Sequence, residues 1–290
     1  EAFGFTPTKY AHIPLIMKME GSSKRKLSKR KDPEAAVSFY QKHGYHPNAV
    51  LEYLTNLANS GFEDWRRANP SKALEDFNFD ISKMGKSGAL FNIDKLNNIG
   101  KEVISKFSAQ EKYKYLVEWA SKYDPELNKL IEKNEEFVVN VFNVETEANI
   151  RKDISGWSEF RAQYGFFFNE IFDAGDLDIQ VLKENSLEKD GLEFLNKYKN
   201  FENRNEWQEY HTRMALDLGY APDTKTYKED PTTYKGHIGN IMTVLRLALT
   251  KSTKSPNLFD VARVLGPQET TRRIEQFINM FDKARTNKLS

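Results

Sequence analysis

The chain has 290 residues, of which 39% are hydrophobic and 29% are charged, and its formal net charge is +1. This composition supports packed cores in about two domains and excludes a disordered tail or a fibrous protein. The absence of cysteine excludes disulfides, cysteine-ligated zinc and a thiol nucleophile.

The sequence also argues against export and membrane insertion. No apolar run approaches the ~20 residues of a membrane-spanning helix, and no secretory signal precedes the first basic cluster. We therefore expect no membrane partner, and the lack of cysteine fits a reducing cytoplasm. The small net charge hides local clusters, because residues 24–31 and the region from about Arg246 onward are cationic while residues 111–209 are rich in acids. A nucleic-acid partner would have to contact such local patches.

The first twenty residues differ from the rest, and a basic stretch follows them. The apolar run Tyr10–Met17 carries a proline, which indicates a strand or an extended segment. After Gly21-Ser22-Ser23 comes Lys24–Lys31, in which six of eight residues are cationic. We expect a mobile loop whose ammonium and guanidinium groups suit a polyphosphate. A solvated basic surface loop is the alternative. Because residue 1 is not methionine and no helix cap or targeting pattern follows it, we expect the chain to begin inside a larger protein.

From Asp32 onward the pattern is helical. Asp32-Pro33-Glu34 offers an N-cap, a proline at the first helical position and an early acid, and the helix over 35–42 should stop at Gly44. Pro47 begins another helix, which ends before Gly61. Further helices are predicted over 91–107, 111–122, 126–144, 147–161, 176–198, 205–218, 240–250 and 268–285. Tyr164–Phe168 should lie in a core, and residues 220–235 and 256–266 should be connecting segments.

Few residues could perform chemistry unaided. The five histidines form no metal-type pair, so we predict no protein-bound metal; they are His12, His43, His46, His211 and His237. Gly85-Lys86-Ser87 ends like a Walker A motif, but the position that needs a glycine is Asp80. His237-Ile238-Gly239-Asn240 is interpreted as a helix start. Lys83–Ser87 resembles a phosphate loop in lettering only, since no predicted strand precedes it.

Lys26-Leu27-Ser28-Lys29-Arg30 resembles the K-M-S-K-S loop of class I aminoacyl-tRNA synthetases, in the K-[LI]-S-K-R form typical of glutamyl-tRNA synthetases. Upstream, Tyr10–Ile16 is similar to the family's Y-A-H-L-P-L-I strand. Downstream, Gly44–Leu54 resembles its G-Y-x-P-E-A-L-x-N-Y-L helix. Later segments also resemble motifs of this family and occur in the same order as in the family. They are Phe91–Asn97, Leu245–Thr250, Ser255–Phe259 and Val264-Leu265-Gly266, the last of which precedes a helix that carries Arg272-Arg273. Residues 175–198 do not align well and are interpreted as a lineage insertion.

The resemblance implies a mainly α fold of the bacterial type. Residues 1–31 would be the end of the α/β nucleotide-binding domain, residues 32–124 a helical stem-contact region, and residues 125–290 an all-α anticodon-binding domain. The first half of the nucleotide-binding domain, with its H-I-G-H motif and glutamate pocket, has no counterpart in these 290 residues. We therefore expect this chain alone to be unable to form glutamyl-adenylate.

The resemblance also implies site residues. Lys26 and Lys29 would support catalysis, and Lys29, Lys26, Ser28 and Arg30 would bind ATP, whose leaving pyrophosphate gains negative charge. The tRNA-binding candidates are Arg246, Lys251, Lys254, Arg263, Arg272 and Arg273. Arginine and lysine bind phosphates, whereas unpaired bases are read by stacking and edge contacts.

The implied activity is the attachment of glutamate to tRNA-Glu, with ATP, Mg²⁺ and L-glutamate as further partners of a monomeric, cytoplasmic enzyme. The alternative is a stand-alone helical RNA-binding module without a catalytic parent. The coding sequence upstream of Glu1 distinguishes the two, because only the first requires an H-I-G-H half there. Whether such an enzyme also charges tRNA-Gln is not readable from the sequence.

Overall fold

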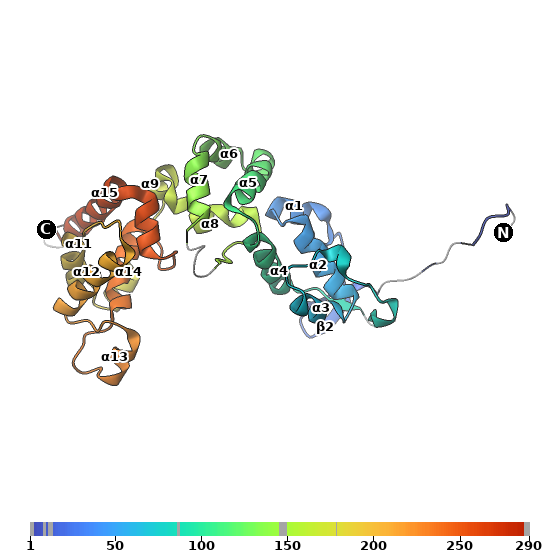
Figure 1. Cartoon of the computed structure of the whole chain (residues 1–290), viewed down its shortest axis with the longest axis horizontal. Coiled ribbons are helices and arrows are strands. Elements are labelled where there is room, and N and C mark those ends of the chain that lie inside the picture. Colours follow the sequence, from blue (N-terminus) through green and yellow to red (C-terminus); the bar gives the residue numbers. More distant parts are fainter. Residues whose placement is uncertain are drawn as a thin grey trace. The chain divides into compact units, whose positions relative to one another are not determined.

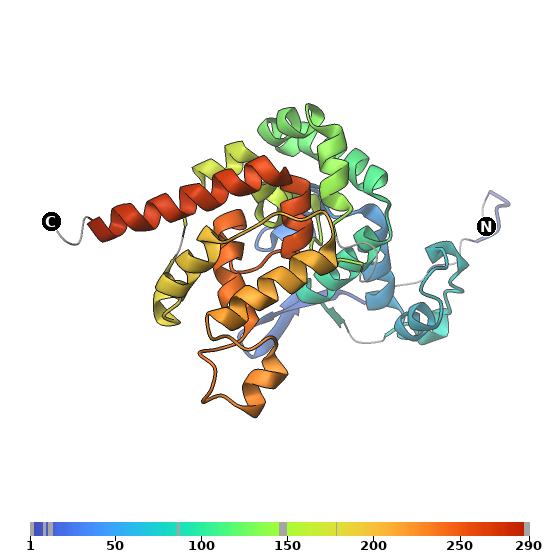
Figure 2. The same ribbon diagram turned by 60° about the vertical axis from the view of Figure 1, so that its left-hand side comes forward.

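We describe the chain from a computed structural model. It describes residues 3–7, 10, 14–85, 88–144, 150–177 and 179–286, with the side chains of 282–286 excepted. Two compact units are present: residues 1–132 with 152–159 form unit 1, and residues 133–151 with 160–290 form unit 2. Figures 1 and 2 show that both are built mainly from short helices. No described helix is long and apolar enough to span a bilayer.

Unit 1 contains a small sheet with the strand order β2-β1-β3. Strand β1 (Ile16–Glu20) pairs antiparallel with β2 (Ser23–Lys26) and parallel with β3 (Ala89–Leu90). The turn between β1 and β2 contains Gly21 at φ +62°, a left-handed conformation that glycine adopts without steric cost. The extended segment predicted up to residue 17 therefore continues to Glu20, while its residues 11–13 lie outside the described part. The first half of the predicted basic loop is a strand.

The rest of unit 1 is helical. Pro47 occupies the first turn of its helix as predicted, and the next long helix begins with a capping box between Ser108 and Glu111. The elements are η1 (Pro33–Ala35), α1 (Val37–His43), α2 (Pro47–Ala58), α3 (Phe62–Ala68), η2 (Leu74–Asp76), η3 (Ile81–Lys83), α4 (Ile93–Ser105), α5 (Ala109–Tyr123), α6 (Pro125–Glu132) and η4 (Trp157–Glu159).

The helix predicted over 147–161 is wrong for residues 150–156, which are irregular, while 145–149 lie outside the described residues. Tertiary contacts replace the helix there. The Trp157 amide donates to the Gly44 carbonyl at 3.1 Å, and Ser155 donates to Glu159 through its amide and its hydroxyl, each at 2.8 Å. Gly44, at φ +72°, permits this approach, because a Cβ there would lie 2.6 Å from the Trp157 nitrogen.

The regular elements of unit 2 are all helices among its described residues, and one isolated parallel β-bridge joins Ala221 to His237. Its elements are α7 (Glu135–Phe142), α8 (Phe160–Tyr164), η5 (Gly165–Phe167), α9 (Asn169–Ala174), α10 (Gln180–Glu184), α11 (Glu188–Asn196), α12 (Arg204–Asp217), α13 (Thr224–Glu229), α14 (Ile238–Thr250) and α15 (Leu258–Thr286). The helix predicted over 176–198 is split, with Ser186 at φ 54° between α10 and α11. Segment 256–266, predicted to be a connection, is mostly helix, and Gly266 at φ 79° marks a kink inside α15.

The core of unit 2 is centred on α14, which packs against α11, α12 and α15. Its residues Ile241, Leu245 and Leu249 have no exposed surface, as expected for a helix covered on several sides. The aromatic stretch predicted to be core is largely so, since Tyr164, Phe167 and Phe168 are 3–7% exposed. His237 caps α14 by accepting a hydrogen bond from the Gly239 amide, which confirms the predicted helix start. The mainly α fold class is thereby confirmed.

His211 on α12 is buried completely, against Trp207 and Tyr198. Its Nδ1–H donates to the Trp207 carbonyl at 2.6 Å, and Nε2 has no hydrogen-bond partner among the described residues. Burial lowers the pKa of His211 to about 4, although the bond to Trp207 opposes the shift. The folded chain therefore holds this imidazole neutral at pH values where an exposed histidine, with a pKa of ~6.5, takes up a proton.

This burial predicts acid sensitivity. Stability from neutral His211 should be complete above pH ~6.5 and should fall progressively to pH ~4, because only the unfolded chain binds the proton in that window. The loss should be roughly 3 kcal/mol of unfolding free energy, at ~1.4 kcal/mol per pKa unit. Urea unfolding between pH 4 and 7 measures it. His211→Phe should flatten this part of the profile, and His43→Ala, at an exposed site, should not.

Candidate functional site

The β1–β2 hairpin sorts the basic residues by face. Arg25 is paired with Lys18 across the strands, whereas Lys24 and Lys26 are paired with methionines of β1. Side chains alternate along a strand, so Arg25 points to one face and the two flanking lysines to the other. Lys24 and Lys26 are exposed and Arg25 is half-buried. One cation of this strand is thus available for internal contacts, and two face outward.

The carboxylate of Asp32 contacts the two cations on the inward face of the hairpin, Arg25 and Lys18. This carboxylate, in a residue that is only 2% exposed, accepts hydrogen bonds from the Arg25 guanidinium at 2.6 and 2.8 Å and lies 3.3 Å from Lys18 Nζ. The Ser28 amide donates to the same carboxylate at 2.8 Å. Hydrogen bonds from Arg25 hold the pKa of Asp32 well below its usual range, against the opposing effect of burial. Asp32 is therefore ionised at neutral pH and ties the strand to the following turn.

The turn after β2 is closed by backbone hydrogen bonds. The Leu27 amide donates to the Ile16 carbonyl at 2.9 Å, and the Lys31 and Asp32 amides donate to the Ser28 carbonyl at 3.0 and 2.8 Å. The intervening residues, Lys29 and Arg30, are exposed. They occupy the tip of a turn whose base is fixed by Asp32.

These contacts place the predicted phosphate-binding residues. Lys26, Lys29 and Arg30 are all exposed, and none has an ion-pair partner among the described residues. Ser28 is half-buried, and its amide is already used by Asp32. The arrangement presents several cations on a small, backbone-fixed turn, which suits binding of a multiply charged anion. No group of three or more acidic or histidine residues that could hold a metal ion occurs in the described part.

Two of the predicted RNA-binding residues of unit 2 are half-buried at the end of α14. Arg246 Nε donates to Ser255 Oγ at 3.1 Å. Lys251, the C-cap at φ 54°, donates from Nζ to the Gly175 carbonyl at 2.6 Å and lies 4.7 Å from the Phe172 ring centroid. Burial lowers the pKa of both side chains. They are held in place by the fold and offer only part of their surface to a partner.

Lys254 and Arg263 are more accessible. Lys254 is exposed and has no ion-pair partner among the residues that are described. Arg263 is 60% exposed and lies 3.6 Å from Asp260, whose carboxylate is 2% exposed and also accepts from Arg204 at 2.7 and 2.8 Å. Because Asp260 is committed mainly to Arg204, the longer contact leaves the Arg263 guanidinium open to solvent.

Adjacent Arg272 and Arg273 have opposite environments. Arg273 has no exposed surface, donates to the Phe166 and Leu249 carbonyls at 2.7 Å each, and lies over the Phe172 ring. It is therefore an internal residue, and we leave it out of the RNA contacts proposed below. Arg272 is 40% exposed and is paired with Glu269 at 2.7 Å and with an aspartate at 3.1 Å.

The carboxylates that organise these cations were not predicted. Burial opposes ionisation of Glu269, but hydrogen bonds from Arg272 and Arg273 outweigh it and lower its pKa to about 2. Its spacing of three and four residues from the arginines is a readable helix signal. For Asp32 the sequence indicated only an N-cap, yet its side chain makes no cap hydrogen bond and binds Arg25 instead. No short-range pattern marks that contact.

Comparison with known proteins identifies a domain within unit 2. A family described as an anticodon binding domain matches residues 225–278, which cover α13, α14 and most of α15. The match shows that an anticodon-binding domain is present within the helical unit 2.

Relatives extend the match to almost the whole chain. It is 41% identical over 283 residues to a glutamate–tRNA ligase of Clostridium perfringens, covering 96% of this chain and 51% of the relative. For the glutamate–tRNA ligase of Clostridium beijerinckii the identity is 39%, covering 97% and 52%. The crystal structure of a glutamate–tRNA ligase from Elizabethkingia meningosepticum shares the fold, with a TM-score of 0.58 at 20% identity, covering 97% of this chain and 53% of that one. The chain therefore matches glutamate–tRNA ligases over almost its whole length and spans about half the length of the curated relatives it matches.

Removal of the Asp32 carboxylate should loosen the backbone of the basic turn. Asp32→Ala removes the acceptor of the Ser28 amide and the partner of Arg25, so amide hydrogen exchange over residues 23–32 should accelerate at least about tenfold. Asp64→Ala, which removes an exposed acid 3.3 Å from Arg67, should leave exchange in this segment unchanged. Equal exchange in both variants would contradict the role given to Asp32.

Proposed function

We propose that the chain is the tRNA-binding part of a glutamate–tRNA ligase, which joins glutamate to tRNA-Glu through an ATP-derived glutamyl-adenylate. The observation that carries this proposal is the 41% identity over 96% of the chain to a glutamate–tRNA ligase. The turn at Lys26–Arg30 fits the nucleotide-binding end of such a part. The match to an anticodon-binding domain fits its tRNA-binding end. The proposed enzyme works in the cytoplasm as a monomer.

The basic turn is the proposed phosphate-binding element. Lys29 at its tip would contact the ATP phosphates, and Lys26 and Arg30 would add positive charge around them. Ser28 would donate a hydrogen bond from its hydroxyl, since its amide is bound to Asp32. Such cations accelerate adenylate formation because negative charge grows on the pyrophosphate as it leaves, and preplaced charges stabilise that state most. Mg²⁺ would accompany ATP in the complete active site.

Unit 2 is the proposed anticodon-binding surface. Lys254, Arg263 and Arg272 have the exposure needed for phosphate contacts, while Arg246 and Lys251 would contribute from half-buried positions. Within the proposed enzyme, residues 1–31 close the nucleotide-binding domain, residues 32–124 contact the tRNA stem, and residues 125–290 bind the anticodon. The split of the structure near residue 132 supports a boundary close to the proposed one at residue 125.

For the phosphate loop, we predict that Lys29→Ala in the full-length ligase slows glutamate-dependent ATP–pyrophosphate exchange by roughly 10²–10³-fold. This is the cost of losing one charge-stabilising donor. Lys31→Ala, an exposed lysine just outside the Lys26–Arg30 motif, should slow it less than tenfold. Equal effects of the two substitutions would contradict the assignment. The 290-residue chain alone should show no exchange, because it holds no H-I-G-H motif.

For the RNA surface, we predict that the chain binds tRNA-Glu with an affinity that falls steeply as salt concentration rises. Lys254→Ala and Arg263→Ala should each weaken binding several-fold and reduce the log–log salt slope by about 0.7–0.9, the value for one phosphate contact. Lys133→Ala removes an exposed lysine of unit 2 before α7 and should change neither quantity. A flat salt response, or equal affinity for arbitrary double-stranded DNA, would contradict the proposed function.

A further inference from the structure

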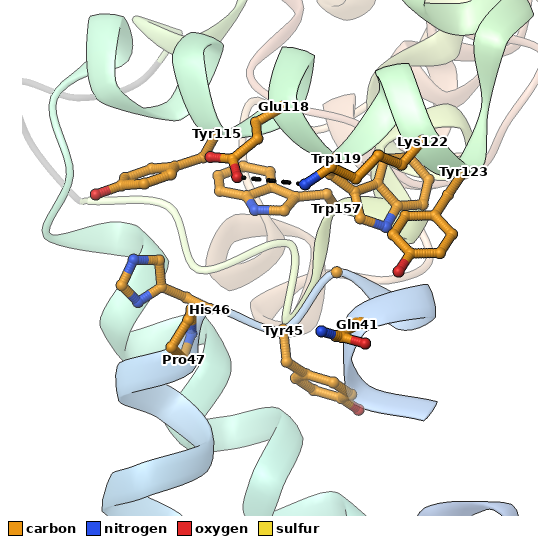
Figure 3. Close-up of a pocket in the computed structure, with 11 residues that line it drawn as sticks. Gln41, Tyr45, His46, Pro47, Tyr115, Glu118, Trp119, Lys122, Tyr123 and Trp157 are labelled. Carbon is orange, nitrogen blue, oxygen red and sulfur yellow. Dashed lines mark ion pairs between the residues drawn. The ribbon is translucent and has the colours of Figure 1, made fainter. Parts of the chain in front are cut away.

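Unit 1 contains an open pocket of ≈280 Å³ that the phosphate loop does not contribute to. Figure 3 shows that α5 forms one wall, the junction between α1 and α2 the other, and Trp157 the side between them. The returning segment that carries Trp157 is held by its hydrogen bond to the Gly44 carbonyl. The pocket is therefore a built feature of unit 1, assembled from three parts of the chain.

Aromatic rings form the walls. Tyr115, Trp119 and Tyr123 are four residues apart on α5, which places them along one face of the helix. The rings of Trp119 and Tyr123 are 6.1 Å apart and 28° from parallel, and those of Tyr115 and Trp157 are 6.3 Å apart and 21° from parallel. Tyr123 is 42% exposed, so its ring is accessible at the mouth. Flat, nearly parallel rings suit a planar ligand better than a branched aliphatic one.

Polar groups at the rim carry little net charge. Glu118 and Lys122 form an ion pair at 3.6 Å, both largely exposed, and Gln41 adds an amide with donors and an acceptor. His46 accepts at Nδ1 from the Asn48 amide, so its neutral form carries the proton on Nε2. Burial lowers the pKa of His46, which favours that neutral form. The rim therefore offers hydrogen bonds to a neutral heterocycle and no cluster of cations for a phosphate.

We infer that this pocket binds an unpaired RNA base by stacking, with rim groups contacting the base edge. The inference rests on the proposed function for its RNA partner. A proline-rich peptide is the other common ligand of aromatic grooves, but an indole N–H inside the groove would have to donate to its carbonyl groups. The Trp119 indole N–H is already committed to the Lys42 carbonyl at 3.1 Å. A base needs a ring face, and the ring of Tyr123, a residue that is 42% exposed, offers one.

The test measures binding of a fluorescein-labelled octaadenylate to the full 290-residue chain by fluorescence anisotropy, at two salt concentrations. Tyr123→Ala should weaken binding roughly tenfold, the size of one base–aromatic stack, and leave the salt slope unchanged. Tyr123→Phe should restore affinity to within about twofold, because it keeps the ring. Phe79→Ala is the matched control, since Phe79 is also an aromatic residue of unit 1 and is 41% exposed; it should have no effect.

The inference is overturned if octaadenylate does not bind, if Tyr123→Ala leaves its affinity unchanged, or if that variant lowers the salt slope as loss of a phosphate contact would. Tyr123-dependent binding of a proline-rich peptide in place of octaadenylate would also overturn it. Failure of the proposed function is distinguishable, because it would abolish the tRNA-Glu binding that depends on Lys254 and Arg263. The inference about the pocket alone is contradicted if tRNA-Glu binding persists while substitution of Tyr123 leaves the affinity for octaadenylate unchanged.

Discussion

The buried carboxylate of Asp32 determines how the basic stretch presents its charge. One arginine, one lysine and the Ser28 amide converge on it, so the chain passes directly from strand β2 into a closed turn. An unpaired buried carboxylate would be strongly destabilising, and Arg25 is the partner that prevents this. As a result, positive charge is divided between an internal anchor and an exposed tip. A ligand at the tip meets cations whose backbone is already ordered, which lowers the entropic cost of binding.

In unit 2, too, positive charge is divided between internal anchors and exposed side chains. Asp260 and Glu269 bind Arg204 and Arg273, and they also contact Arg263 and Arg272, which stay partly exposed. Arg273 links η5, α14 and α15 through hydrogen bonds to backbone carbonyls, in the manner of a structural cation fully enclosed by partners. The proposed RNA contacts of this unit are therefore fewer than its arginine and lysine content suggests. They depend on the cations that keep exposed surface beside their carboxylate partners.

Much of this was predictable from the sequence. Proline and glycine positions correctly indicated the helices at Val37–His43 and Pro47–Ala58, and ordered motifs identified the family. The exposure of individual cations was not predictable, because Arg272 and Arg273 are identical neighbours that differ only by ~100° of rotation around one helix. The irregular segment before Trp157 was also missed, since its conformation is set by contacts with Gly44, more than a hundred residues earlier. Likewise, the aromatic pocket of unit 1 is formed by three separated segments that no local pattern connects.

We propose that these 290 residues recognise tRNA-Glu partly through its anticodon. The most direct measurement compares, at one salt concentration, the affinity of the chain for tRNA-Glu and for the same tRNA carrying an exchanged anticodon. Phosphate contacts are the same in both molecules, so any difference reports base recognition. The account predicts at least about tenfold weaker binding of the exchanged tRNA, since a mismatched base typically costs ~1–3 kcal/mol. Equal affinity for the two tRNAs would contradict it.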